Sequence, residues 1–200
     1  MRKGTKTIIA LAIVVALLLL AISGCGKKNF DKEYNNMQIG NIDSYQLDLR
    51  IYGEENVNFK IDNYKNESYK VYTSDATYYV INNSTYKEIM GDEIKYVMVD
   101  TKLFTNTDIL LQGLKNIKSR KEVKNDITDL DLELYDVTFD SKYIKSLLNE
   151  LAYDSNYNNA KGKIYIKDNN IYKIIYEIDD LTITATFFRI NNIRKPDIGQ

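Results

Sequence analysis

The chain has 200 residues, with 27 lysines and arginines against 28 aspartates and glutamates, and it contains no histidine and no tryptophan. The near-neutral charge gives no electrostatic footprint for nucleic acid, and the lack of histidine removes the commonest catalytic base and transition-metal ligand. A single cysteine, Cys25, excludes an internal disulfide framework, so packing and backbone pairing must supply the stability.

Residues 1–24 have the pattern of a secretory signal peptide. Basic residues between positions 2 and 6 precede an uncharged, largely apolar run over residues 7–22, which is shorter than the about 20 residues of a spanning helix. The small residues Ser23 and Gly24 suit a signal peptidase. An uncleaved membrane helix or a plain secretory signal with an incidental cysteine is the alternative. Cleavage would leave 24 basic and 28 acidic side chains, a net charge of −4.

The segment Ile22-Ser23-Gly24-Cys25 resembles the lipobox of bacterial lipoproteins. The resemblance implies that Cys25 receives a diacylglyceryl group and becomes the mature N-terminus, which anchors the chain because two or three acyl chains bind a bilayer stably. We expect residues 25–41 to form a lipidated tether. A composition rich in Asn, Lys, Ile and Tyr fits a Gram-positive-type envelope, with the domain on the extracytoplasmic face of the cell membrane.

From Ser44 onward the hydrophobic pattern has a period of two, which predicts half-buried strands. In the first strand Tyr45, Leu47, Leu49 and Ile51 alternate with polar side chains. Short turns rich in Asn, Gly, Asp and Ser separate the strands, as in an antiparallel meander. The predicted strands cover residues 44–52, 57–64, 69–73, 77–81, 85–89, 94–99, 133–139, 163–167, 171–178 and 181–190.

Two amphipathic helices are predicted between the strands. Thr107 is a candidate N-cap for the first helix, and Asp140 or Ser141 for the second. A charged stretch, residues 118–129, follows the first helix without an assigned structure. The apolar series are Ile109, Leu110, Leu114 and Ile117, and then Tyr143 or Ile144, Leu147, Leu148 and Leu151.

These elements predict one α+β domain over residues 42–192, followed by a polar C-terminal tail over residues 193–200. The economical packing is a mostly antiparallel, strongly twisted sheet with two helices on one face. The order of elements resembles the LolA-like and LppX/LprG-like lipoprotein carriers, on the strand 45–51, the hairpin 77–89 and the strand-to-helix segment 135–144. That resemblance implies a half-open β-barrel whose concave apolar face is covered by helices, and a function in carrying acyl chains or lipidated molecules.

Three patterns could indicate a reactive or polar site. Ser84-Thr85-Tyr86-Lys87 matches S-x-x-K of β-lactamases, but it falls in a predicted hairpin, where serine and lysine are not one helical turn apart. Asp129, Asp131 and Glu133 could bind Ca²⁺, but a solvated strand face explains them better, and the glycine of an EF-hand loop is missing. Seven tyrosines could line a cleft or simply suit half-buried strands: Tyr52, Tyr64, Tyr72, Tyr78, Tyr79, Tyr86 and Tyr96.

The best candidate for a ligand surface is an apolar face shared by the first strands and the second helix. We expect a non-enzymatic surface lipoprotein that binds a lipidic ligand there, without a cofactor, a metal or nucleic acid. The alternative is an interaction module of the cell envelope with a filled core, which binds an unidentified protein by strand addition. The candidate residues are Leu47, Leu49, Ile51, Phe59, Ile61, Val71, Leu147 and Leu148.

Overall fold

The structure, a computed structural model, describes residues 42–123, 132–154, 157 and 160–198. The predicted signal peptide, the lipobox with Cys25 and the tether lie outside the described residues. The domain boundaries drawn from the sequence therefore stay predictions.

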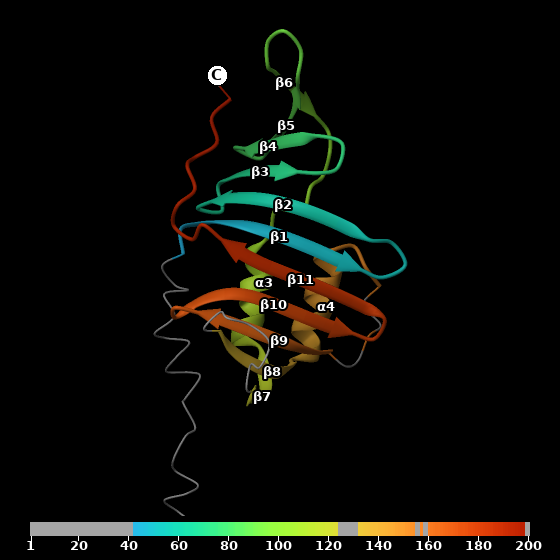
Figure 1. Ribbon diagram of the computed structural model, residues 1–200. Helices are drawn as coiled ribbons and strands as arrows, with labels where there is room; N and C mark the ends of the chain where they lie inside the picture. Colours follow the sequence, from blue (N-terminus) through green and yellow to red (C-terminus); the bar gives the residue numbers. More distant parts are fainter. Residues whose placement is uncertain (1–41, 124–131, 155–156, 158–159, 199–200) are drawn as a thin grey trace, which may run out of the picture. The chain divides into compact units, whose positions relative to one another are not determined.

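Eleven strands form a single antiparallel sheet in the order β6-β5-β4-β3-β2-β1-β11-β10-β9-β8-β7 (Figure 1). The first and last strands pair at its centre, with Leu49 opposite Ala185. Because β6 and β7 are the two ends of this order, the sheet is not closed. The strands are β1 (Ser44–Tyr52), β2 (Val57–Tyr64), β3 (Ser68–Tyr72), β4 (Thr77–Ile81), β5 (Ser84–Ile89), β6 (Lys95–Val99), β7 (Ile117–Val123), β8 (Glu133–Phe139), β9 (Ala160–Lys167), β10 (Asn170–Ile178) and β11 (Leu181–Phe188).

The hairpin turns use residues that tolerate a left-handed backbone. Both central residues have positive φ at Asn82–Asn83 (51° and 62°) and at Asp168–Asn169 (51° and 60°). Asn and Asp adopt this conformation at a lower cost than other side chains, and two such residues match the twist of antiparallel strands. The predicted meander is confirmed, and β1, β2, β4 and β8 have the predicted bounds.

Within the described ranges, two short helices lie on one face of the sheet. They are α3 (Asp108–Gln112), which continues into the 3₁₀ turn η2 (Gly113–Lys115), and α4 (Ser141–Glu150). Figure 1 shows both helices behind β1, β11, β10 and β9. The prediction of a mostly antiparallel α+β fold with two helices is confirmed.

Asp140 caps α4 as predicted. Its carboxylate accepts hydrogen bonds from the backbone N–H groups of Lys142 (2.8 Å) and Tyr143 (3.3 Å). These backbone bonds, together with the nearby Lys118 ammonium, lower the pKa of the Asp140 side chain. The helix then turns Tyr143, Ile144, Leu147 and Leu148 into the core, as the apolar spacing predicts.

Thr107 occupies the N-cap position of α3 as predicted, but two other details of the predicted first helix are wrong. Thr107 precedes α3, but its side chain makes no capping bond because its hydroxyl meets Tyr45 Oη (2.6 Å) and accepts a bond from Asn63 Nδ2 (2.9 Å). Ile117 begins strand β7 instead of extending the helix, and this strand occupies part of the charged stretch. The polar sequence of β7 does not show the pattern of a strand, because the strand is determined by its pairing with β8.

A cluster of buried aromatic residues fastens the helices to the sheet. Tyr176 of β10 is fully buried, and its hydroxyl donates to the carbonyl of Leu110 (2.6 Å). The Tyr143 hydroxyl donates to the carbonyl of Ile109 (2.9 Å) and lies 2.9 Å from the Tyr176 hydroxyl. Gly113 passes so close to both hydroxyls that a Cβ there would clash with them. The polar atoms of this core are therefore satisfied between α3, α4 and β10.

Residues 189–198, the described part of the chain after β11, contain no strand, and two of their apolar side chains are buried. Ile193 and Ile198 are both buried, and the Ile193 N–H donates to Ser44 Oγ (3.4 Å). The tail therefore contributes apolar contacts to the domain.

Candidate functional site

The predicted apolar face is mostly closed core. Seven of its eight residues are at most 2% exposed, so other side chains of the protein fill most of this face. Phe59 is the exception and is half-buried. The fully packed members are Leu47, Leu49, Ile51, Ile61, Val71, Leu147 and Leu148.

At the end of this face, Ile51 and Phe59 line a groove of about 650 Å³. The groove lies between the β1–β2 hairpin, the irregular segment 102–106 and the C-terminal end of α4. Its volume falls within the range of small-molecule sites, and its lining combines apolar side chains with a few polar ones. The other lining residues are Glu54, Glu55, Val57, Lys102, Leu103, Phe104, Thr105, Asn106, Asn149, Glu150, Leu151, Ala152 and Tyr153.

The end of α4 shapes one wall of this groove. Ala152 adopts a left-handed conformation (φ 60°), and the N–H of Tyr153 bonds back to the carbonyl of Leu148 (2.9 Å). This is the geometry with which helices commonly end, although glycine is the usual residue at the left-handed position. The reversal places Leu151, Ala152 and Tyr153 together along the groove.

The opposite wall comes from the β1–β2 hairpin and from a strap, which we define as residues 100–106. The strap has no regular secondary structure up to Asn106, and Leu103 and Phe104 are half-buried within it. Among the described residues, no hydrogen bond involves Thr101 to Phe104. Side-chain packing therefore holds this part of the strap against the sheet.

A second groove of about 860 Å³ lies on the other side of the strap. It shares Lys102, Leu103 and Thr105 with the first groove and also contacts Val80 and Val99. The strap thus separates two hollows.

The rim of the first groove is acidic. Glu54, Glu55 and Glu150 are exposed there, and Lys102 is the basic side chain among its lining residues. Burial raises the pKa of Tyr153, and the negative charge of Glu55 raises it further. Glu55 therefore acts electrostatically on the helix side of the groove.

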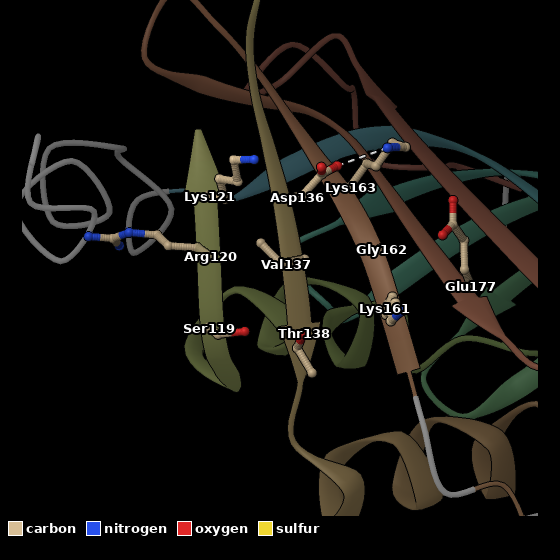
Figure 2. Close-up of a pocket in the computed structure, with 10 residues that line it drawn as sticks. All are labelled: Ser119, Arg120, Lys121, Asp136, Val137, Thr138, Lys161, Gly162, Lys163 and Glu177. Atoms are coloured by element: carbon tan, nitrogen blue, oxygen red, sulfur yellow. Dashed lines mark hydrogen bonds and ion pairs between the residues drawn. The ribbon is translucent and has the colours of Figure 1, made fainter. Parts of the chain in front are cut away.

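A third hollow, of about 330 Å³, lies across β7 to β10 and is lined by mostly polar side chains (Figure 2). Lys163 and Asp136 lie opposite each other on β9 and β8 and form an ion pair (2.8 Å), visible as the dashed line. The hydrogen bond to Asp136 raises the pKa of Lys163. This cross-strand ion pair stabilises the pairing of β8 with β9.

The other candidates from the sequence do not form a reactive site. Ser84 and Lys87 lie three positions apart on strand β5, so their side chains point to opposite faces of the sheet. The Lys87 ammonium lies over the Tyr78 ring, 5.9 Å from its centroid. Of the Ca²⁺ candidates, Asp129 and Asp131 lie outside the described residues, and Glu133 accepts a hydrogen bond from the Tyr135 hydroxyl (2.9 Å).

The seven tyrosines lie on strands, and none of them is among the described residues that line the first groove. Tyr79 is buried, packs edge-on against Tyr96 and donates a hydrogen bond to Glu88 (2.8 Å). Lys70 lies over the rings of both Tyr72 and Tyr79. For these residues the structure gives a packing role.

Within the part of the chain that the structure describes, no helix has the length and hydropathy to cross a membrane. The same residues contain no group of three or more acidic, His or Cys side chains placed to hold a metal ion.

Sequence reasoning missed several residues that line the groove. Leu103 and Phe104 fall between the predicted strand 94–99 and helix, and Leu151 and Tyr153 fall at a helix end and in a predicted loop. The sequence does contain one indication of this site, because Leu103 and Phe104 are adjacent apolar residues in an otherwise polar connection. Residues that point inward from a loop are commonly found at ligand sites.

Comparison with known proteins supports the fold. No protein-family model matches the chain, and no curated protein matches it. LprF from Mycobacterium bovis superposes with a TM-score of 0.58 at 12% identity, over 83% of this chain and 95% of that chain. The lipoprotein LppX from Mycobacterium tuberculosis has a TM-score of 0.55 at 12% identity, over 86% of this chain and 100% of that chain. The expected LppX-like fold is therefore confirmed.

Proposed function

We propose that this chain is a membrane-anchored surface lipoprotein that binds an apolar or lipidic ligand without catalysing a reaction. The observation that carries the proposal is the groove of about 650 Å³ between the sheet, the strap and the end of α4. The fold shared with LppX, whose name describes a lipoprotein, agrees with it. A strongly twisted half-barrel with its concave face toward the helices would direct an acyl chain into this groove.

The energetics favour an apolar ligand. Phe59, Leu103 and Phe104 are only half-buried, so a hydrocarbon chain laid against them removes further apolar surface from water. Each buried CH₂ group contributes about 0.8 kcal/mol to binding. Because the strap is held by packing without hydrogen bonds from Thr101 to Phe104, its displacement would enlarge the groove at a low cost in backbone bonding.

Uptake of a fluorescent long-chain lipid by residues 26–200 tests this function, because this piece contains every described strand and helix. We expect saturable binding that falls at least tenfold in Phe59→Gln and Leu103→Gln. Ile94→Gln and Val97→Gln make the same change at exposed apolar positions outside the groove, and they should bind like the natural sequence. No saturable uptake, or equal losses in both pairs of variants, would exclude the groove as the site.

Anchoring is a separate part of the proposal and rests on the sequence of residues 22–25. We expect the full chain to incorporate labelled fatty acid and to remain with membranes, and Cys25→Ser to lose the label. An unlabelled natural chain would contradict the lipid anchor.

A second candidate function is an interaction module that pairs through strand β6. This strand ends the sheet, and exposed apolar side chains gather along it and its hairpin: Met90 is 78% exposed, Met98 68% and Ile94 55%. Beyond Lys95, which begins the strand, β6 carries no charged residue, and an edge of this kind can accept a strand from a partner. Crosslinking in the intact envelope would test it, because Val97→Lys should then abolish capture of one defined partner protein.

A further inference from the structure

We propose that the groove selects amphiphiles with a cationic headgroup over those with an anionic one. This inference rests on the proposed function, since it assumes that an acyl chain enters the groove. It adds the chemical class of the headgroup, which the apolar lining leaves open.

The rim charges come from three separate elements that meet at the same opening. Glu54 and Glu55 lie in the turn between β1 and β2, Glu150 ends α4, and Lys102 lies in the strap. Three carboxylates and one ammonium leave an excess of negative charge around an apolar floor. A headgroup held at this rim would sit within one Debye length, about 8 Å at physiological ionic strength, of several of these charges.

The three carboxylates are not neutralised by the protein itself. Among the described residues, none of Glu54, Glu55 and Glu150 forms an ion pair or a side-chain hydrogen bond. In the third hollow, by contrast, the charges of Asp136 and Lys163 are paired with each other. No cation in the described part of the chain is therefore paired with the three carboxylates at this opening.

The end of α4 adds to the negative potential. Helices commonly place Lys or Arg in the last turn, where a positive charge offsets the partial negative charge of the final carbonyl groups. Here the last turn contains no basic residue and ends in Glu150. A cation bound at the groove would offset the partial negative charge at the C-terminal end of α4.

A concave site lined by one sign of charge concentrates ions of the opposite sign and repels like charges. The apolar side chains of the groove would bind the hydrocarbon chain of any amphiphile. The charged rim would make the affinity depend on the headgroup. We expect about a tenfold preference for a cationic over an anionic amphiphile of equal chain length at low salt, and a smaller preference at high salt.

The test compares three probes with the same twelve-carbon chain, all below their micellar concentrations: dodecyltrimethylammonium, neutral monolaurin and anionic laurate. Calorimetric titration into residues 26–200 gives three dissociation constants. We expect the cationic probe to bind about tenfold more tightly than laurate, with monolaurin between them. In the triple variant Glu54→Gln, Glu55→Gln, Glu150→Gln this ratio should fall to about threefold or less, while binding of monolaurin stays unchanged.

A matched variant, Glu67→Gln, Glu93→Gln, Glu122→Gln, removes the same charge at exposed positions outside the groove and should keep the tenfold ratio. If it lowers the ratio as much as the rim variant, net charge accounts for the preference and the proposal is wrong. Monolaurin binding together with equal affinity for the two charged probes also refutes the rim selection but leaves lipid binding intact. Failure of monolaurin to bind contradicts the proposed function itself.

Discussion

Replacing Tyr176 by phenylalanine should loosen the helices from the sheet without changing the shape of the core. Tyr176 is 0% exposed, and the substitution removes its 2.6 Å hydrogen bond to the carbonyl of Leu110 and its contact with the Tyr143 hydroxyl. Tyr143 keeps its own bond to the carbonyl of Ile109. Loss of one buried hydrogen bond to a neutral acceptor costs about 1.5 kcal/mol of unfolding free energy, which for a domain of this size lowers Tm by roughly 3–6 °C.

Urea unfolding followed by circular dichroism measures this loss as a lower midpoint with an unchanged m-value. Tyr165→Phe is the matched control, because Tyr165 is half-buried and no hydrogen bond of its hydroxyl exists among the described residues, so its effect should stay within about 0.5 kcal/mol. A Tyr176→Phe protein as stable as this control would refute the role given to the buried tyrosines.

Three further changes test the packing. Burial raises the pKa of Tyr45, Tyr143 and Tyr176 above the ordinary value of about 10, so these hydroxyls ionise in the unfolded chain before they ionise in the folded one. The free energy of unfolding should therefore be constant below about pH 10 and fall above it, by up to roughly 1.4 kcal/mol per pH unit for each tyrosine. Denaturant midpoints measured against pH check this. Ala152→Gly should raise stability by about 0.5–1 kcal/mol in urea unfolding, since glycine adopts the left-handed conformation without the penalty that a Cβ brings, and a loss would show that the methyl group matters more. Gly162→Ala should destabilise by roughly 2 kcal/mol or more because its Cβ would meet a carbonyl of β10 and an aromatic ring, and an unchanged melting temperature would contradict this tight approach.

Most of the sheet could be predicted from the sequence because local signals and tertiary packing agree there. Alternating side chains in β1 and β2 face a single core, and turns such as Asn82–Asn83 favour the backbone that a hairpin needs. Strand β7 could not be found in this way. Its sequence, Ile117–Val123, is mainly charged, and the cross-strand bonds to β8 that hold it are not local.

The cap of α3 shows why a residue type alone did not determine its role. Thr107 stands at the right position, but Tyr45 and Asn63 come from distant strands and use its hydroxyl. The second cap succeeded because one carboxylate oxygen of Asp140 accepts the N–H groups of the following turn, while Lys118 contacts the other oxygen.

The role of the predicted apolar face in ligand binding stays a prediction. The apolar face correctly pointed to the side of the sheet that the helices cover, and Ile51 and Phe59 do reach the groove. Periodicity could not show that most of the face is packed shut, because closed core and ligand surface have the same apolar pattern. Leu103 and Tyr153 line the groove because the strap and the C-terminal end of α4 pack near each other. This tertiary arrangement leaves no periodic pattern in the sequence.

The most direct test of ligand binding is native mass spectrometry of residues 26–200 after purification from bacterial cytosol, followed by organic extraction of the same sample. We predict a lipid bound at a defined stoichiometry, and its loss in Phe59→Gln. A clean protein mass, with no lipid in the extract and no uptake of added monolaurin, would contradict the account.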